Sequence, residues 1–204
     1  MTPSSVKRDL LNVPNLLTLA RIAVIPAVVV LLERQSPVAT FWASVLFGLA
    51  SATDYFDGYL ARKLKLVSLT GKFLDPLADK LMVMACLVQL AAMGWLEAWI
   101  PIVLLARELS VQGLRQIASG EGLIIAAGQQ GKWKTAFQLI GLIGLLAHYT
   151  YPVNFGVFTA EINFHRVGWW MLALSIAFSL VSAGQYFLGF LKAIGEKAAR
   201  PESQ

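Results

Sequence analysis

The sequence predicts an all-α membrane protein that crosses the bilayer six times. Of its 204 residues, 57% are hydrophobic and only 14% are charged, which is far from the composition of an ordinary soluble domain. The apolar residues gather in six long stretches, each near the length of about 20 residues that a helix needs to cross a hydrocarbon core. The connections between these stretches are too short for a second domain.

The expected spans follow one another with short polar connections. We place them at residues 16–32, 40–60, 77–96, 99–117, 135–151 and 167–190. Residues 1–13 mix charged and apolar side chains, so we expect them to lie along the membrane interface before Pro14 opens the first span. The whole chain, 1–204, then forms one domain with a six-helix core at 14–190 and a cytoplasmic tail at 191–204.

Lysine and arginine are distributed unevenly between the two ends of these spans. An even number of spans puts both termini on one side, and nearly all flanking basic residues fall on that side. The other side keeps little more than Arg34 and Arg166. Because loops rich in lysine and arginine remain in the cytoplasm, we expect both termini to be cytoplasmic. As partners we expect membrane lipids and no nucleic acid.

Four aspartates lie within twenty-six residues at the cytoplasmic ends of the second and third spans. Asp54 and Asp57 are three residues apart, and Asp75 and Asp79 are four apart, so each pair shares one face of its helix. A hairpin of the two helices would bring the four carboxylates together, where they repel one another unless cations intervene. No histidine or cysteine lies nearby to favour zinc, so we expect Mg²⁺ or Mn²⁺.

Simple charge pairing is the alternative role for these aspartates. The candidate partners are Arg62, Lys63, Lys72 and Lys80. Pairing alone does not require the small residues Gly58, Ala61 and Gly71 at the intervening positions, whereas a bulky ligand that approaches the helix backbones closely does. We therefore favour a metal site that also binds a ligand.

One motif contains all of these residues. It reads Asp54-x-x-Asp57-Gly58-x-x-Ala61-Arg62, then eight residues, then Gly71-x-x-x-Asp75-x-x-x-Asp79. This pattern resembles the complete signature of the CDP-alcohol phosphatidyltransferase family. The resemblance implies a six-helix membrane fold, usually a homodimer, that transfers a phosphatidyl group from a CDP-linked lipid to an alcohol and releases CMP.

The same resemblance implies roles for the residues of the motif. Two Mg²⁺ or Mn²⁺ ions would be held by the four aspartates, and Asp79 would also be the general base. Small residues would leave room for the cytidine, and Arg62 would contact the diphosphate. The residues expected to make room are Gly58, Ala61 and Gly71.

A second set of polar residues lies near the same end of the spans. Its members are Asn15, Thr18 and Arg21 on the first span, Arg107 and Arg115 on the fourth, and Lys132 and Lys134 at the start of the fifth. These cations exceed what four metal-bound carboxylates need, which favours an acceptor that carries a phosphate over choline, ethanolamine or serine.

Each of these residues also has an ordinary structural alternative. Lys132 and Lys134 could contact anionic lipid headgroups, and Arg107 could be neutralised by Glu108. Arg115 could extend to the membrane interface, and Thr18 and Arg21 could pack between helices. Small residues could serve helix contacts within or between subunits, at Gly48, Ala52, Gly141, Gly144 and Gly184.

A further resemblance narrows the acceptor. The stretches Ala106-Arg107-Glu108-Leu109, Leu114-Arg115 and Gly131-Lys132-Trp133-Lys134-Thr135-Ala136-x-Gln138 are similar to the bacterial phosphatidylglycerophosphate synthases. This similarity implies a bacterial cytoplasmic (inner) membrane protein whose active site faces the cytoplasm. It implies CDP-diacylglycerol as donor, with Asn15 and Thr18 among its contacts, and glycerol 3-phosphate as acceptor. The acceptor phosphate would bind to Arg21, Arg107, Arg115, Lys132 and Lys134.

Three other functions remain open. The same chemistry could use inositol phosphate or phosphatidylglycerol as acceptor. A metal-ion or anion transporter would place carboxylates near mid-membrane within repeated halves, whereas these aspartates cluster at one interface and the sequence has no internal repeat. A non-catalytic lipid-binding scaffold would be expected to lack a metal ligand or the general base, and this sequence has both.

Overall fold

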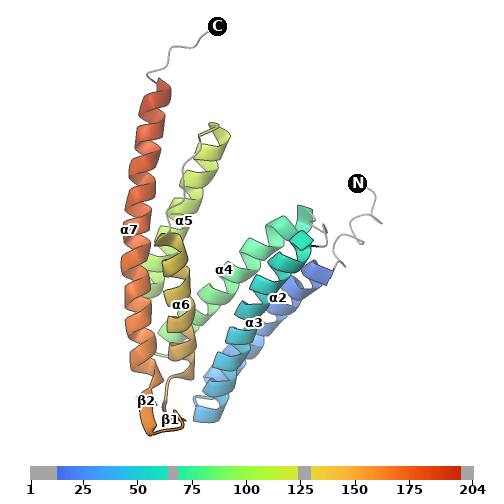
Figure 1. Cartoon of the computed structure of the whole chain (residues 1–204), viewed down its shortest axis with the longest axis vertical. Helices are drawn as coiled ribbons and strands as arrows, with labels where there is room; N and C mark the ends of the chain where they lie inside the picture. Colours follow the sequence, from blue (N-terminus) through green and yellow to red (C-terminus); the bar gives the residue numbers. More distant parts are fainter. Residues whose placement is uncertain (1–12, 64–68, 124–129, 199–204) are drawn as a thin grey trace.

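The computed structural model describes residues 13–63, 69–123 and 130–198. Within these ranges the chain forms six α-helices and one β-hairpin (Figure 1). The elements are α2 (Val13–Glu33), α3 (Pro37–Lys63), α4 (Leu69–Ala92), α5 (Trp99–Gly120), α6 (Gln130–Ala147), β1 (Thr150–Asn154), β2 (Thr159–Asn163) and α7 (Phe164–Ala198).

The helices run alternately up and down the molecule in two groups. Helix α2 packs along both α3 and α4, while α7 packs along α5 and α6. Figure 1 shows the two groups diverging from the end that carries the hairpin toward the end where α2 begins and α7 ends. We call these the hairpin end and the open end. The first residue of α2 and the last residue of α7 therefore lie at the same end of the bundle, as an even number of spans requires.

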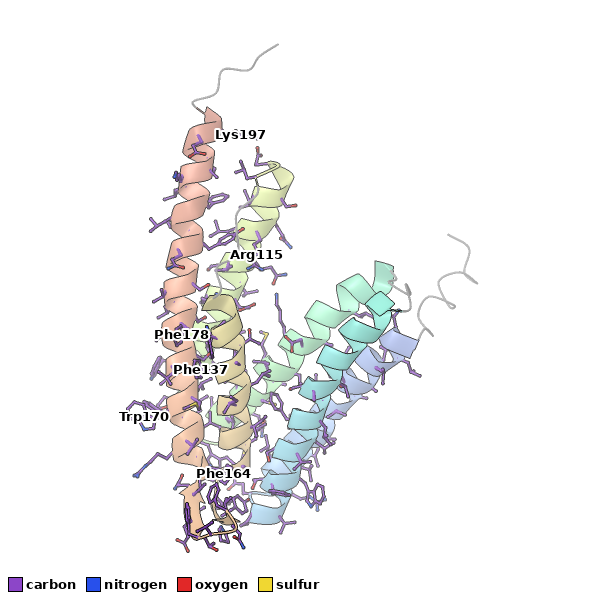
Figure 2. The ribbon with its side chains drawn as sticks, viewed as in Figure 1. Arg115, Phe137, Phe164, Trp170, Phe178 and Lys197 are labelled. Carbon is purple, nitrogen blue, oxygen red and sulfur yellow. The ribbon has the colours of Figure 1, made fainter. Side chains whose placement is uncertain are left out.

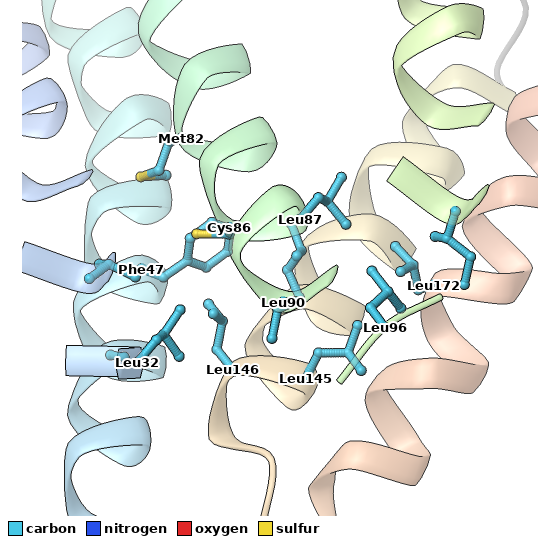
Figure 3. Packing of buried hydrophobic residues seen from close by; sticks show 14 of the residues in the cluster. Leu32, Phe47, Met82, Cys86, Leu87, Leu90, Leu96, Leu145, Leu146 and Leu172 are labelled. Atoms are coloured by element: carbon cyan, nitrogen blue, oxygen red, sulfur yellow. The ribbon is translucent and has the colours of Figure 1, made fainter. Parts of the chain in front are cut away.

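A single apolar core joins the two groups (Figure 3). It contains side chains from all six helices, including Leu32, Phe47, Met82, Leu104, Leu145 and Leu172. Cys86 is part of this core and is 1% exposed. Close packing of this kind holds helices together even where lipid replaces water, because van der Waals contact does not depend on the surrounding solvent.

Large apolar side chains also cover the outside of the bundle. Trp42, Ile102, Trp170 and Leu188 are all more than half exposed, and Figure 2 shows Trp170 pointing away from α7. Such a surface would promote aggregation in water but is suited to contact with lipid chains. Two segments, Asn15–Glu33 and Phe164–Lys197, are long and apolar enough to cross a membrane by length and composition. Each of the six predicted spans overlaps one of the six helices, with ends that differ as described below, while the crossing of the membrane by all six stays a prediction.

Glycines bring α6 and α7 unusually close together. A Cβ atom added to Gly168 would lie 2.4 Å from the backbone nitrogen of Leu145, and one added to Gly144 would lie 2.8 Å from the Cα of Gly168. At Gly141 the added atom would lie 2.8 Å from the backbone nitrogen of Leu172. Small residues permit this approach of two backbones. Gly141 and Gly144 therefore serve a contact within the chain.

Several helix boundaries differ from those predicted. Helix α4 begins at Leu69 rather than near residue 77, because its first polar turns continue the helix beyond the apolar stretch on which the prediction was based. It ends at Ala92, and the chain then turns at Gly94, whose φ of 71° suits glycine. Helix α7 continues to Ala198, so the predicted tail is helical over residues 191–198. The interfacial segment predicted at 1–13 lies outside the described residues except for Val13, which begins α2.

The β-hairpin corrects the all-α expectation locally. The fifth span was predicted to reach residue 151, but α6 ends at Ala147 and β1 begins at Thr150. The strands pair antiparallel from Thr150 opposite Asn163 to Asn154 opposite Thr159. In the turn between them the side chain of Asn154 accepts a hydrogen bond from the amide of Gly156 at 2.8 Å. The turn residues Phe155, Val157 and Phe158 are apolar and exposed, and each strand is only five residues long, so hydropathy alone did not separate the hairpin from the end of the fifth span.

Candidate functional site

The predicted metal ligands occupy two helices at the open end of the bundle. Asp54 and Asp57 belong to α3, and Asp75 and Asp79 belong to α4. Because both segments are continuous helices, each pair shares a helix face, as predicted. The structure does not describe the side chains of the first three aspartates. The meeting of all four carboxylates therefore stays a prediction, as do the roles assigned to Gly58, Ala61, Arg62, Gly71 and Lys132.

Asp79 lines a cavity of about 110 Å³ between α4, α5 and α6. The polar residues of its wall are Asp79, Lys80, Glu108, Lys134, Thr135 and Gln138. Its apolar residues include Val83, Leu87 and Leu104, which lie one or two turns closer to the core on the same helices. The wall of the cavity is thus charged toward the open end and apolar toward the hairpin end. Asp79, the predicted general base, lies on the charged side.

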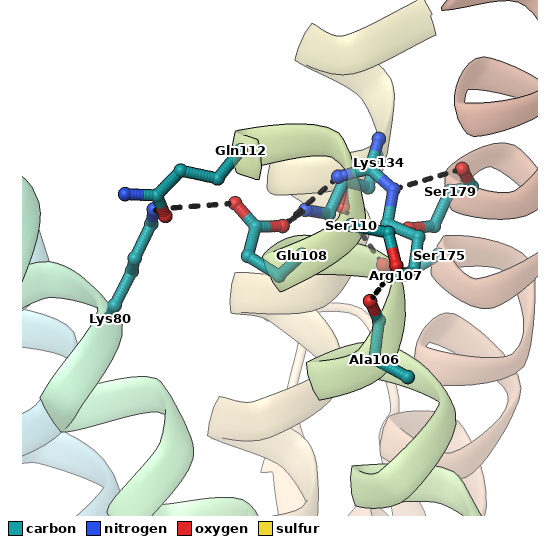
Figure 4. A network of polar contacts seen from close by, with 9 residues as sticks. All are labelled: Lys80, Ala106, Arg107, Glu108, Ser110, Gln112, Lys134, Ser175 and Ser179. Carbon is teal, nitrogen blue, oxygen red and sulfur yellow. Dashed lines mark hydrogen bonds and ion pairs between the residues drawn. The ribbon is translucent and has the colours of Figure 1, made fainter. Parts of the chain in front are cut away.

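Glu108 is the centre of an ion-pair network at this cavity (Figure 4). Its Oε2 atom accepts hydrogen bonds from Nζ of Lys134 at 2.5 Å and from Nη1 of Arg107 at 3.0 Å. Nζ of Lys80 lies 4.0 Å from its Oε1 atom and also donates to the side chain of Gln112. One carboxylate thereby links cations from three helices, α4, α5 and α6.

Helix α7 also contacts the residues of this network. Nε of Arg107 donates to the carbonyl oxygen of Ser179 at 3.1 Å, and Oγ of Ser175 donates to the carbonyl oxygen of Lys134 at 3.0 Å. The side chains of Arg107 and Lys134 are only 10% and 12% exposed. The Arg107 side chain is consequently held by both Glu108 and α7, while the ammonium group of Lys134 is held by Glu108 and its backbone by Ser175.

Arg115 lies further along α5 toward the open end. Its guanidinium carbon is 5.5 Å from the centre of the Tyr186 ring on α7, a cation–π contact, and the residue is exposed (Figure 2). Arg107 and Arg115 thus both contact α7, because residues eight apart lie on a common face of a helix. The structure pairs Lys134 with Arg107 through Glu108, but it places Arg115 two turns away from that network.

The first-span residues are buried in a helix contact. Asn15, Thr18 and Arg21 are at most 2% exposed. Nε of Arg21 donates to the carbonyl oxygen of Ala50 on α3 at 3.1 Å. Ala50 lies one turn before Asp54, so this hydrogen bond braces the part of α3 that carries the aspartates. The contact agrees with the helix-packing alternative for Arg21, and a role in phosphate binding stays a prediction.

Sequence reasoning missed the central position of Glu108. It was considered only as a neighbour that could neutralise Arg107. An available signal was its place inside a largely apolar helix, because a carboxylate there is functional more often than not. Lys80 and Gln138 were likewise noted in the sequence without a site role, and both line the cavity.

A helical bundle with an apolar exterior is typical of a membrane-associated protein, and this bundle has a charged cavity at one end. The family model described as CDP-alcohol phosphatidyltransferase matches residues 11–181. The chain therefore belongs to the CDP-alcohol phosphatidyltransferase family and is a phosphatidyltransferase. Members of this family generally use divalent metal ions.

Two of the named relatives are similar to most of the chain, and a third to about two thirds of it. The CDP-diacylglycerol–glycerol-3-phosphate 3-phosphatidyltransferase of Bacillus subtilis is 40% identical over 188 residues, which cover 86% of this chain and 93% of that protein. The enzyme of the same name from Mycoplasma pneumoniae is 34% identical over 220 aligned positions, covering 97% of this chain and 95% of that protein. The corresponding enzyme from Rickettsia bellii is 41% identical over 131 residues, covering 64% of this chain and 72% of that protein.

Proposed function

We propose that the protein transfers the phosphatidyl group of CDP-diacylglycerol to glycerol 3-phosphate, giving phosphatidylglycerol phosphate and CMP. The names of relatives that align over nearly the full chain support this reaction. The structural observation that carries the proposal is the cavity beside Asp79, where Lys80 and Lys134 form part of the wall. An acceptor bearing a phosphate would meet cations and the proposed base in one place.

We also propose that Asp54, Asp57, Asp75 and Asp79 bind two divalent cations, Mg²⁺ or Mn²⁺. The donor set fits such ions, because it consists of carboxylate oxygens only and because each pair lies three or four residues apart on a continuous helix. When bound, these ions would offset the negative charge of the diphosphate and of the departing CMP.

The side chains of the protein would then transfer the proton and bind the two substrates. Asp79 would accept the proton of the primary hydroxyl of glycerol 3-phosphate as that oxygen attacks the β-phosphorus of the donor. A new phosphorus–oxygen bond forms in line with the bond that breaks, and CMP leaves with the electron pair. Arg107 and Lys134 would bind the acceptor phosphate, Arg62 would contact the diphosphate, and the small residues of the motif would make room for cytidine.

We further propose that all six helices cross a bacterial cytoplasmic membrane with the open end toward the cytoplasm, and that the protein is a homodimer. The apolar exterior of the bundle and the concentration of basic residues near the open end support this orientation. A water-soluble acceptor could reach a site at that end without entering the hydrocarbon core.

The test is release of CMP by the purified protein from CDP-diacylglycerol in mixed micelles containing Mg²⁺ or Mn²⁺. Glycerol 3-phosphate, inositol phosphate, serine and phosphatidylglycerol are offered separately, with Asp79→Asn as the inactive control. We expect turnover with glycerol 3-phosphate and its loss in the variant. Turnover only with another acceptor would retain the chemistry but overturn the acceptor, and no metal-dependent turnover with any of them would favour the transporter or scaffold alternative.

A further inference from the structure

Glu108 is surrounded by positive charge in a way that a simple ion pair does not require. Two cations, Arg107 and Lys134, share its Oε2 atom, and Lys80 approaches its Oε1 atom. The carboxylate itself borders the cavity that contains Asp79. Three positive charges and one negative charge leave this group with a net charge of +2.

A phosphate monoester complements that charge. Its second pKa is about 6, so it carries close to two negative charges at neutral pH. Without Glu108, three cations would face one another in a partly dehydrated space, and Arg107 and Lys134 would repel each other at close range. With Glu108 present, the group matches a dianion in charge and the two cations remain in fixed positions.

The described contacts also leave hydrogen-bonding capacity for a ligand. An ammonium group has three N–H donors and a guanidinium has five. The contacts described for Lys134 use one donor on Glu108, and those for Arg107 use one on Glu108 and one on Ser179. The remaining N–H groups of both cations can therefore bind phosphate oxygens while Glu108 stays in place.

We propose that Glu108 is a positioning residue that sets the charge and the geometry of a subsite for the phosphate monoester dianion of the acceptor. This inference rests on the proposed function. Glu108 acts through Lys134 and Arg107: it joins α5 to α6 and holds the two cations at one carboxylate oxygen, so that a single phosphate group can contact both. It does not contact the reacting atoms, so its removal weakens acceptor binding much more than it slows the chemical step.

The experiment compares Glu108→Gln, Glu108→Asp and Glu121→Gln with the wild-type full-length enzyme in the CMP-release assay. Glu121 is the matched control, because it is also a carboxylate paired with a lysine but lies at the exposed end of α5, where Nζ of Lys197 is 2.6 Å from its Oε2 atom. The quantities measured are kcat, the KM for glycerol 3-phosphate and the KM for CDP-diacylglycerol.

For Glu108→Gln we expect the KM for glycerol 3-phosphate to rise about tenfold, with kcat and the KM for the lipid donor within about twofold of wild type. Glu108→Asp keeps the charge on a shorter side chain and recovers part of the loss. Glu121→Gln behaves like wild type. A fall in KM in Glu108→Gln would overturn the inference, because it would mean that the carboxylate competes with the acceptor for the cations.

A double-mutant cycle with Lys134→Met tests the route of action and does not depend on a single variant. If Glu108 acts through Lys134, adding Glu108→Gln to Lys134→Met raises KM by much less than it does in the wild-type background. Full additivity would contradict the inference, as would a loss of kcat at unchanged KM. Absence of wild-type turnover with glycerol 3-phosphate would instead reject the proposed function, so the two failures are distinguishable.

Discussion

The two ends of the bundle are held together by different kinds of contact. At the hairpin end, hydroxyl groups bond to backbone carbonyls: Tyr149 donates to Gln35 and Tyr151 to Pro37, both at 2.6 Å, and the buried Thr40 donates to Ala147 at 3.2 Å. At the open end, charged side chains meet around a cavity. Neutral bonds to a fixed backbone give a rigid base, whereas clustered charges can be retained for binding.

This difference leads to a simple expectation. Changes at the hairpin end alter stability and leave the catalytic constants almost unchanged, while changes at the open end alter the constants and leave stability almost unchanged. Stability can be followed with a thiol-reactive fluorophore, because Cys86 is the one cysteine of the sequence and is buried in the core. Its thiol becomes accessible when the helices separate.

The largest effect is expected at the open end, from Lys134→Met. The change removes the cation closest to Glu108 and leaves that carboxylate with Arg107, so we expect the KM for glycerol 3-phosphate to rise about 100-fold. The midpoint of thermal unfolding should change little. Lys192→Met is the control, since Lys192 is exposed on α7. An equal rise in both variants would mean that bulk charge, rather than the subsite, attracts the acceptor.

Gly168→Ala tests the hairpin end. The new Cβ atom would lie 2.4 Å from the backbone nitrogen of Leu145, so α6 and α7 must move apart, and we expect a loss of about 2 kcal/mol of stability. Gly184→Ala is the matched control in the same helix, because nothing lies within 4 Å of its added Cβ atom. The comparison of the two ends would fail if both variants unfolded at the wild-type temperature.

Acid should weaken the hairpin end through His148. Its ring stacks on Trp95 with ring centres 3.6 Å apart, and burial, followed by the charge on His165, lowers the pKa of His148 from 6.5 to about 4. The unfolded chain binds this proton more readily, so the stabilising contribution is complete above pH 6.5 and is lost as the pH falls toward 4.

Because His148 is only partly buried, we expect this acid-dependent loss to be about 1–2 kcal/mol. The measurement is the thermal midpoint at pH 7 and pH 4.5 in wild type and in His148→Phe, which keeps an aromatic ring but cannot take up a proton. The variant should lose less stability than wild type between the two pH values. Equal losses would show that other groups cause the acid sensitivity.

The smallest effect is expected from Tyr149→Phe and Tyr151→Phe. Tyr149→Phe removes the bond to Gln35, between α2 and α3. Tyr151→Phe removes the bond to Pro37, the first residue of α3, and the longer one to Ala147 at 3.3 Å, and we expect each substitution to cost about 1 kcal/mol of stability. The KM for glycerol 3-phosphate should stay at the wild-type value in both variants. A shift in that KM would show that the hairpin end communicates with the cavity, contrary to the separation described above.

The helices could be predicted because the length of each apolar stretch can be read from the sequence without knowledge of tertiary contacts. The six helices lie where the apolar stretches are, and only their ends differ. The hairpin could not be predicted in this way, since its stability depends on pairing Thr150 with Asn163 and on tyrosines that reach another loop.

The part of the candidate site that depends on spacing along one helix could be predicted, and the contacts between helices could not. Spacing places Asp75 and Asp79 on one helix face, and the adjacency of Arg107 and Glu108 is visible in the chain. The partnership of Glu108 with Lys134 is not visible, because it joins residues 26 positions apart through the packing of α5 and α6. Likewise, spacing gave Arg21 a place near the aspartates, but not its hydrogen bond to the backbone of α3.

The unequal heights of the two helix groups affect how substrates can approach. In Figure 1, α5 and α7 extend well past the ends of α3 and α4 at the open end, and the pair formed by Lys197 and Glu121 joins their outer turns. The longer helices α5 and α7 form the taller side of the open end. Under the proposed function, a water-soluble acceptor would reach the site, and CMP would leave it, over the shorter ends of α3 and α4, the two helices that carry the aspartates.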